Sequence, residues 1–240
     1  MGIKILVTGS SSGIGAEIVR ELSKQNYVES IGIHYHENEC SANLLAESLS
    51  EMVNTKVFQE DFSSPNIKIV KNFIKEFGEI NAVVNCAGII SSIPFDKMAT
   101  SEYDKLMNIN SRAAFLVSRD AFNEMKSYGG KIVNISSIAT KFGIGRNESI
   151  QYAASKATLD MLTIGLAKIG AKYNILANSI SPGPIMSKIH EGRPDLEERK
   201  NLIPLKRFGT TMDIANMVEY LVSAKGDFIT GQIIRISGGE

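Results

Sequence analysis

The sequence has 240 residues, of which 43% are apolar and 22% charged, as is usual for a soluble globular protein. Its 26 basic side chains balance its 26 acidic ones, so no overall charge attracts nucleic acid or an anionic membrane. The 2 cysteines and 3 histidines offer no metal-ligand spacing, and the sequence shows neither a signal peptide nor a membrane-spanning run, so we expect a metal-free, cytoplasmic protein.

Short apolar runs alternate with longer amphipathic stretches along the chain. The predicted strands are Ile3–Thr8, Ser30–Tyr35, Lys56–Glu60, Ala82–Asn85, Lys131–Ser136, Ile175–Ser181 and Gln232–Ile236. The predicted helices are Ile14–Gln25, Ala42–Met52, Ile67–Phe77, Ser101–Lys126, Tyr152–Lys172 and Thr211–Ser223. Nearly continuous apolar strands are typical of a parallel sheet covered on both faces. The alternation therefore predicts an α/β fold with one doubly wound, Rossmann-type parallel sheet of about seven strands, in a single domain spanning residues 1–240.

One long segment, Gly183–Pro204, fits neither pattern. It carries many charges and three prolines, and Pro182 directly precedes it. An irregular loop of this length in a compact domain is usually functional. We therefore expect residues 184–204 to form a lid over a substrate.

A glycine-rich turn, Thr8–Gly15, directly follows the first predicted strand and opens the first helix. Gly9 permits a tight turn, Gly13 lets the backbone approach a phosphate, and Gly15 lets the helix pack on the strand. Such a turn offers backbone N–H groups and the positive end of a helix dipole to a pyrophosphate. The alternative is a turn that merely closes a β–α connection, but its place after the first strand favours dinucleotide binding.

Three further segments end predicted strands, where ligands bind in sheets of this kind. Asp61 follows the third strand and either accepts a hydrogen bond from an adenine amino group or caps the next helix. Asn85–Gly88 ends the fourth strand with small residues that leave room for a ribose, and Pro182-Gly183 ends the sixth. Cys86 is interpreted as a small buried filler rather than a nucleophile, because no histidine is placed to activate it.

Tyr152 and Lys156 lie one turn apart on the same predicted helix face. They follow Asn134–Ser137 at the end of the fifth strand, on the ligand side of the sheet. A tyrosine must lose about three units from its ordinary pKa of about 10 to exchange protons near neutrality, and a nearby ammonium favours that loss. Ser137 would donate a hydrogen bond to a carbonyl or alkoxide oxygen. The pattern indicates proton transfer at an oxygen.

These motifs, in this order, resemble those of the short-chain dehydrogenase/reductase family over essentially the whole chain. Thr8–Gly15 matches the family's Thr-Gly-x-x-x-Gly-x-Gly turn, and Asn85–Gly88 matches Asn-Asn-Ala-Gly with cysteine in place of the second asparagine. Asn110 falls at the position of the family's catalytic asparagine. Pro182–Ile185 resembles the segment that meets the nicotinamide, with Ser187 where threonine is usual.

The resemblance implies a nicotinamide-dependent oxidoreductase that interconverts a ketone and a secondary alcohol by hydride transfer. The catalytic residues that it implies are Asn110, Ser137, Tyr152 and Lys156. Tyr152 would donate and accept the proton, Lys156 would hold the nicotinamide ribose, and Asn110 would support a water relay. The expected cofactor contacts are Gly9, Ser11, Ser12, Gly13, Ile14, Gly15, His36, Asp61, Phe62, Asn85, Ala87, Gly88, Tyr152, Lys156, Pro182, Gly183, Ile185 and Ser187.

The choice between the two nicotinamide cofactors depends on the end of the second strand, His34–Glu37. An acid there would accept a hydrogen bond from the ribose and select NAD. The first three positions carry no acid, and Glu37 lies slightly beyond the position where the selective acid is expected. The segment resembles an Asn-Tyr form of NADP-using members, although Ser12 stands where many of those carry arginine. We expect NADP(H), with NAD(H) as the alternative. An ordinary surface position is the favoured interpretation for both His34 and His36, although either could approach a 2′-phosphate.

The substrate is encoded less clearly. Ile203–Gly209 and Thr230-Gly231 resemble 3-oxoacyl-[acyl-carrier-protein] reductases of fatty acid biosynthesis, so a carrier-bound carbonyl compound is one expected substrate. The stretch Lys141–Ile150 departs from that subgroup and would border the substrate pocket. A ketone on a sugar or another small metabolite is therefore the alternative.

A carrier protein is acidic and would need a basic face on this chain. Lysines that could form one are Lys126, Lys131, Lys168 and Lys172. A solvated helix surface is the favoured interpretation for them.

Two alternative functions, which are not enzymatic, stay open. A sensor that binds NADP without catalysis explains the glycine turn but gives no reason for Ser137, Tyr152 and Lys156 together. An oligomeric scaffold is the other. In the family, helices equivalent to Ala113–Lys126 and Tyr152–Lys172 pair between subunits, so the resemblance implies a homotetramer.

Overall fold

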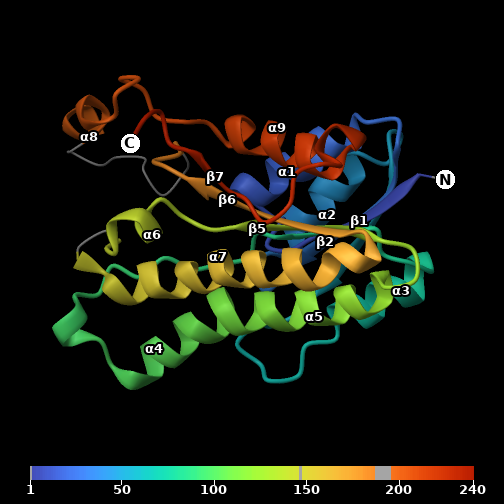
Figure 1. Ribbon diagram of the computed structural model, residues 1–240, viewed down its shortest axis with the longest axis horizontal. Helices are drawn as coiled ribbons and strands as arrows, with labels where there is room; N and C mark the ends of the chain where they lie inside the picture. Colours follow the sequence, from blue (N-terminus) through green and yellow to red (C-terminus); the bar gives the residue numbers. More distant parts are fainter. Residues whose placement is uncertain (1, 146–147, 187–195) are drawn as a thin grey trace.

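The computed structural model describes residues 2–145, 148–186 and 196–240. Its strands form one sheet of seven in the order β3-β2-β1-β4-β5-β6-β7, and every neighbouring pair is parallel (Figure 1). The strands are β1 Ile3–Val7, β2 Val28–Tyr35, β3 Asn54–Gln59, β4 Ala82–Asn85, β5 Gly130–Ile135, β6 Ile175–Pro182 and β7 Ile233–Ile236. This arrangement confirms the predicted doubly wound α/β fold.

Helices cover both faces of the sheet, with α1, α2 and α9 on one side and α3, α5 and α7 on the other (Figure 1). The helices are α1 Gly13–Ser23, α2 Glu39–Ser48, α3 Ile69–Phe77, α4 Thr100–Met107, α5 Ala113–Met125, α6 Ala139–Phe142, α7 Ile150–Gly170, α8 Leu196–Leu202 and α9 Thr211–Val222. Shorter turns of 3₁₀ helix span Phe95–Lys97, Ala171–Tyr173 and Ala224–Gly226, and a π-helical turn spans Asn108–Arg112.

The central strand β1 shows why the sequence forms a sheet with two covered faces. Ile5, Leu6 and Val7 are all fully buried. Successive side chains of a strand point to opposite faces. Ile5 and Val7 therefore join the core beneath α1 and α9, whereas Leu6 joins the core beneath α3 and α5. Burial of each such side chain stabilises the fold by about 1.5–3 kcal/mol.

The strand order places the site. Connections from β1 run to one side of the sheet and connections from β4 run to the other, so the chain diverges between these two strands. Ligands bind at the carboxyl ends of the strands at such a switch point. The glycine turn follows β1 and Asn85–Gly88 follows β4, so both motifs meet there.

The predicted strands are confirmed, with ends that shift by no more than two residues. The predicted helix Ser101–Lys126 is wrong as one element, because the π-helical turn divides it into α4 and α5. In this turn the Ala113 amide bonds the Asn108 carbonyl five residues back, so the turn holds one more residue than an α-helix. The lid over residues 184–204 stays a prediction: 187–195 lie outside the described residues, and the segment contains the unpredicted α8.

In the part of the chain that the structure describes, no helix has the length and apolar character to cross a membrane.

Candidate active site

The glycine turn is fixed by its packing against the end of β4. Gly9 has a φ of +63°, and a Cβ there would lie 2.6 Å from the Cα of Ala87. The Thr8 hydroxyl oxygen accepts hydrogen bonds from the amides of Cys86 (3.0 Å) and Ala87 (3.1 Å). Only glycine satisfies both the backbone conformation and the close approach at position 9. The role of Thr8 was not among the predicted contacts, and only its place in the family motif could have indicated it.

The N-terminus of α1 is open to a ligand. Ser12 precedes the helix, and its side chain makes no capping hydrogen bond to any residue that the structure describes. Gly13 is exposed, and a Cβ there would meet no described atom within 4 Å. The first amides of a helix have no partner within the helix, and the helix dipole makes this end positive. The predicted contacts from Ser11 to Gly15 therefore offer amide donors, and the turn fits a dinucleotide pyrophosphate.

Gly15 has a different task in the same turn. A Cβ at this position would lie 2.4 Å from the Gly9 carbonyl oxygen. The helix can therefore start directly above the turn only with glycine there, as the sequence predicted.

Asp61, after β3, does not cap a helix. Its Oδ1 accepts a hydrogen bond from the Ser63 amide and its Oδ2 accepts one from the Ser63 hydroxyl, both at 2.8 Å. These bonds stabilise the carboxylate and lower the pKa of Asp61. The residue before α3 is Lys68, so the helix-cap alternative is wrong. Asp61 stays exposed at the carboxyl edge of the sheet.

The two histidines at the end of β2 differ from one another. His36 is exposed, as predicted, and its ring lies 3.6 Å from carboxylate oxygens of both Glu37 and Asp61. The surface interpretation of His34 is wrong, because this residue is only 3% exposed. It lies on the buried side of the strand end and stacks on the ring of Phe62.

The imidazole of His34 bridges two segments of the site. Its Nδ1 accepts the Gly9 amide at 2.8 Å, and its Nε2 lies 3.0 Å from the Glu60 carbonyl oxygen. Phe62, a predicted cofactor contact, is buried with its ring against His34, so only its backbone is left for a ligand. Sequence reasoning missed the role of His34; the neighbouring Ile31 and Ile33 indicated a buried strand but not the partners of the imidazole.

At the end of β4, Asn85 is buried rather than available to a ribose. Its side-chain amide donates to the Ser118 hydroxyl (2.9 Å) and to Asn134 Oδ1 (2.8 Å). It therefore ties β4 to α5 and β5. Gly88 is exposed, and a Cβ there would lie 3.1 Å from Lys156 Nζ. The predicted small residues thus make room for the lysine as well as for a ligand.

Asn110 lies in the π-helical turn and is fully buried. Its Oδ1 accepts the Ile89 amide (2.8 Å), and its Nδ2 donates to the Ile89 carbonyl (2.9 Å) and the Ser155 hydroxyl (3.0 Å). The side chain therefore joins the loop after β4 to α7. These bonds occupy the side chain, so a water relay would have to use the Asn110 backbone carbonyl. π-Helical turns often occur at functional positions.

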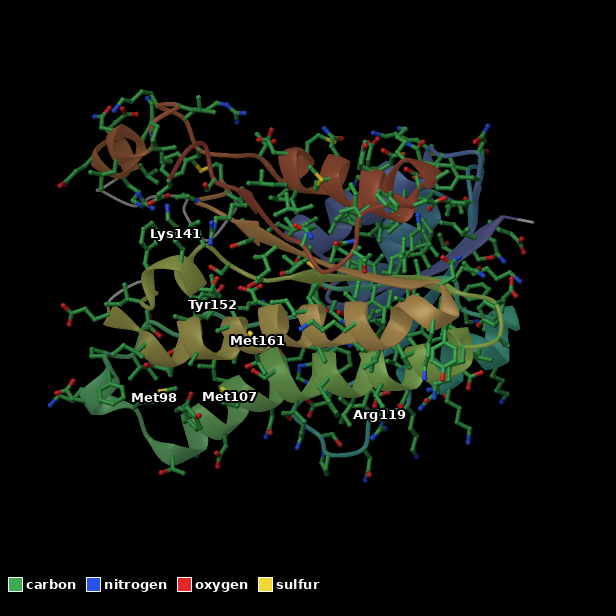
Figure 2. All side chains as sticks on the ribbon, viewed as in Figure 1. Met98, Met107, Arg119, Lys141, Tyr152 and Met161 are labelled. Atoms are coloured by element: carbon green, nitrogen blue, oxygen red, sulfur yellow. The ribbon has the colours of Figure 1, made fainter. Side chains whose placement is uncertain are left out.

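Tyr152, Lys156 and Ser137 meet beside the end of β5. Figure 2 shows Tyr152 on the side of α7 that faces the sheet. Its phenol lies beside the Ser137 side chain, which acts to lower the pKa of Tyr152. Lys156 is 5% exposed, and its Nζ donates to the Ile135 carbonyl at 2.9 Å. The structure therefore brings together these three predicted residues, with Asn110 one side chain away through Ser155.

Burial dominates the electrostatics of this cluster. It raises the pKa of Tyr152, and the Ser137 side chain only partly offsets it. Burial also lowers the pKa of Lys156 to about 8. The sequence predicted a lowered tyrosine pKa for the enzyme with its cofactor bound, whereas in the free protein burial raises it. A raised pKa keeps Tyr152 protonated near neutrality, which suits a proton donor.

The thiol of Cys86 lies near the same lysine. Burial raises the pKa of Cys86 to about 11, although Lys156 opposes this effect. A thiol with this pKa stays protonated and is a poor nucleophile. Cys86 packs against the core, so its interpretation as a filler is confirmed.

The segment Pro182–Ile185 is held in place by three neighbours. The Ile138 amide donates to the Pro182 carbonyl, and the Gly183 amide donates to the Ile236 carbonyl, both at 2.8 Å. Ile185 pairs with Gly209 in a parallel bridge. These contacts therefore fix the segment beside the carboxyl ends of β6 and β7. Ser187, also predicted to contact the cofactor, lies outside the described residues.

Comparisons with known proteins agree with this geometry. The family model described as enoyl-(acyl carrier protein) reductase matches residues 9–240. A 3-oxoacyl-[acyl-carrier-protein] reductase of Staphylococcus aureus is 31% identical over 98% of this chain and 96% of that protein. The structure of a blue fluorescent protein from a metagenomic library, in complex with NADPH, gives a TM-score of 0.92 at 33% identity and covers 99% of this chain and 97% of that one. The structure of an acetoin dehydrogenase from Enterobacter cloacae gives a TM-score of 0.91 at 29% identity and covers 100% of this chain and 95% of that one.

The chain belongs to the short-chain dehydrogenase/reductase family. It is an NAD(P)-dependent oxidoreductase that acts on CH–OH and C=O groups.

Proposed function

We propose that this protein is an NADP(H)-preferring enzyme that reduces a ketone to a secondary alcohol, and catalyses the reverse reaction, with Tyr152 as the acid and base. The observation that carries the proposal is the gathering of Tyr152 and Ser137 beside the buried Lys156 at the carboxyl edge of the sheet. A sensor that only binds the cofactor would not need a phenol, a hydroxyl and an ammonium gathered at this place.

Each residue has a distinct task in this proposal. The bound nicotinamide dinucleotide supplies or accepts the hydride at the carbon that bears the oxygen. Tyr152 donates its phenolic proton to the carbonyl oxygen in reduction and takes a proton from the alcohol in oxidation. Ser137 donates a hydrogen bond to the same oxygen as its charge develops. Lys156, held by the Ile135 carbonyl, has further N–H donors for the nicotinamide ribose.

The preference for NADP(H) rests on the end of β2. The carboxylate of Asp61 is already hydrogen-bonded to Ser63, and Glu37 projects into solvent with its side chain 86% exposed. Neither is a preformed acceptor for the ribose hydroxyls, so NAD gains little. His36 is the exposed basic group there, but two carboxylates near it oppose a 2′-phosphate, so the preference is modest.

The ratio of kcat/KM with NADPH to that with NADH tests the preference. We expect NADPH to be favoured. A tenfold preference for NADH, about 1.4 kcal/mol in the opposite direction, would overturn it.

Two substrate classes compete. The similarity to 3-oxoacyl-[acyl-carrier-protein] reductases supports a carrier-bound 3-oxoacyl group. Three of the four candidate lysines, however, have partners on this chain. Lys131 pairs with Asp227 at 2.6 Å, Lys172 lies over the ring of Tyr173, and Lys126 donates to Asn123. These contacts weaken the case for a basic face, and the similarity to an acetoin dehydrogenase supports a small free ketone as the second candidate.

Oxidation of NADPH with a panel of carbonyl compounds separates the candidates. The panel contains an acetoacetyl thioester, acetoin, diacetyl and keto sugars. We expect the thioester to be reduced with the largest kcat/KM. A diketone or hydroxyketone reduced at least tenfold better assigns the protein to small ketones. Tight NADPH binding without reduction of any compound would favour the sensor.

The homotetramer also belongs to this proposal. Phe115 on α5 and both Met161 and Ile169 on α7 are large apolar side chains that are at least half exposed. Figure 2 shows Met161 on α7 beside α5, and Arg119 at the outer side of α5. Pairing of these helices between subunits would cover them. Light scattering of the wild type and of Met161→Glu tests this assembly, because a charge at a buried subunit contact should dissociate it.

A further inference from the structure

We propose that His34 is a positioning residue for the cofactor: its neutral imidazole, with the proton on Nε2, holds the glycine turn in the conformation that receives the dinucleotide phosphates and links this turn to the segment after β3. This role concerns cofactor binding alone, so it does not depend on which ketone is the substrate.

The contact with Gly9 fixes the state of the ring. The Gly9 amide can only donate, so Nδ1 of His34, 2.8 Å away, must accept with its lone pair. The ring is then neutral and carries its proton on Nε2. That proton points to the Glu60 carbonyl oxygen at 3.0 Å, which can only accept. Both ring nitrogens are therefore satisfied by backbone groups of two different segments.

A second set of bonds holds the same two segments in register. The Ser10 amide donates to the His34 carbonyl (2.9 Å), and the His34 amide donates to the Ser10 hydroxyl oxygen (3.0 Å). The Ser10 hydroxyl in turn donates to the Val7 carbonyl at 2.7 Å. Residues 9 and 10 are thus attached to His34 by three hydrogen bonds directly before the amides that face the phosphates.

The other end of the imidazole orders the edge where we expect the adenine. The Glu60 amide donates to the Tyr35 carbonyl, and its own carbonyl receives the His34 proton. Asp61 follows immediately. The ring of Phe62 stacks on the imidazole with centroids 4.2 Å apart and planes 12° apart. One buried side chain therefore spans from the phosphate turn to the adenine edge.

The second tautomer and the protonated ring are both incompatible with this arrangement. Each would place an Nδ1–H against the Gly9 N–H, so two donors would face one another and the turn would have to move. The surroundings favour the neutral ring: His34 is buried, and burial lowers its pKa to about 4. The nearby titratable His36 acts in the same direction, whereas the Glu60 carbonyl opposes it.

Two substitutions separate positioning from packing. In His34→Asn, the side-chain oxygen can reach the place of Nδ1 and accept the Gly9 amide, but nothing reaches Glu60. In His34→Gln, the longer amide can reach the Glu60 carbonyl, but no acceptor remains for Gly9. We expect the dissociation constant of NADPH, measured by fluorescence, to stay within about threefold in the first variant and to rise at least about tenfold in the second.

A control and a kinetic readout accompany the pair. Tyr27→Phe removes a hydrogen bond of 2.9 Å to Glu219 at the opposite end of β2, so it perturbs the fold away from the cofactor. It should leave NADPH binding unchanged. In His34→Gln, kcat at saturating NADPH should stay within about twofold, because Tyr152 and Lys156 do not contact this region. Similar losses of NADPH affinity in both His34 variants, or an unchanged affinity in His34→Gln, would overturn the proposal.

A spectroscopic measurement keeps the proposal testable if His34→Gln does not fold. Nitrogen chemical shifts of the His34 ring in the wild-type protein report which nitrogen carries the proton. We expect the proton on Nε2 at pH 7, both free and with NADPH bound. A proton on Nδ1, or on both nitrogens, in either state would contradict the proposed role.

Discussion

The carboxyl edge of the sheet has two halves that are built in different ways. The phosphate half, formed by the ends of β1, β2 and β3, presents backbone amides, and its buried side chains serve to hold that backbone: Thr8, Ser10 and His34 all bond to main-chain groups. The catalytic half presents side chains themselves, chiefly Tyr152 and Lys156 from α7. A backbone site depends on conformation, whereas a side-chain site depends on the chemistry of single groups.

The two halves also respond differently to burial. In the phosphate half, burial keeps His34 neutral, which is the form that its hydrogen bonds require. In the catalytic half, burial disfavours the phenolate of Tyr152, which alcohol oxidation needs, and the ammonium of Lys156, which favours that phenolate and binds the ribose. We therefore infer that the phosphate half is complete without ligand, whereas the catalytic half reaches its working electrostatics only with cofactor bound.

Tyr152→Phe gives the largest expected effect and breaks only the catalytic half. The substitution removes one hydroxyl and keeps the ring, so the packing of α7 should persist. We expect kcat on the best substrate to fall by about 10²–10⁴-fold, as is typical for the loss of a general acid. The dissociation constant of NADPH should change little, since the phosphates contact the turn after β1. Turnover close to that of the wild type would remove Tyr152 from the mechanism.

Protonation of His34 at low pH should destabilise the phosphate half of the folded protein. Its pKa is about 4 in the folded protein and about 6.5 in an unfolded chain, so the unfolded state binds more protons. The stabilising contribution is fully present above pH 6.5 and is lost as the pH falls. At pH 4 we expect a loss of about 3 kcal/mol from this residue.

Urea unfolding between pH 7 and pH 4 measures this loss. His34→Asn serves as the reference, because it lacks the titrating group while its carboxylates titrate as in the wild type. Parallel curves for the two proteins would show that His34 does not titrate as the structure indicates.

The smallest expected effects are the losses of stability caused by alanine at two glycines of the turn, Gly9 and Gly13, and they differ in size. Gly9→Ala places a Cβ 2.6 Å from the Cα of Ala87, so the free protein should lose about 2 kcal/mol or more. In Gly13→Ala the new Cβ contacts no described atom, so the protein should lose only about 1 kcal/mol from the strain of a positive φ. NADPH affinity should nevertheless fall in Gly13→Ala, because the new methyl group lies where the phosphates approach. Equal destabilisation by the two substitutions would contradict this distinction.

Patterns in the sequence predicted the strands well because most contain a short apolar run, such as Ile5–Val7 in β1 and Ala82–Val84 in β4, which are buried on both faces. They could not predict the break at Asn108–Arg112, since the apolar periodicity of α4 and α5 continues across it with only one extra residue. They also could not show that His34 is buried. That outcome depends on Gly9 and Glu60, which lie 25 and 26 residues away in the chain.

The catalytic residues were predictable to a different degree. Tyr152, Lys156 and Ser137 follow from the order of motifs, and the structure brings them together. The pKa of Tyr152 was not predictable, because a count of neighbouring charges omits the cost of burial, which here exceeds the effect of the Ser137 side chain. The pairing of Lys131 with Asp227 likewise joins residues that are 96 positions apart.

The π-helical turn makes the length of one segment as important as its composition. Each residue of an α-helix advances the chain by about 100°. Deleting one residue within 108–112 would restore a regular helix, yet it would rotate α4 against α5 by about that angle. Leu106, now 1% exposed, would leave the core, or Asn110 would lose Ile89 and Ser155. A change in the number of residues in this stretch should therefore be as damaging as the loss of the Asn110 side chain.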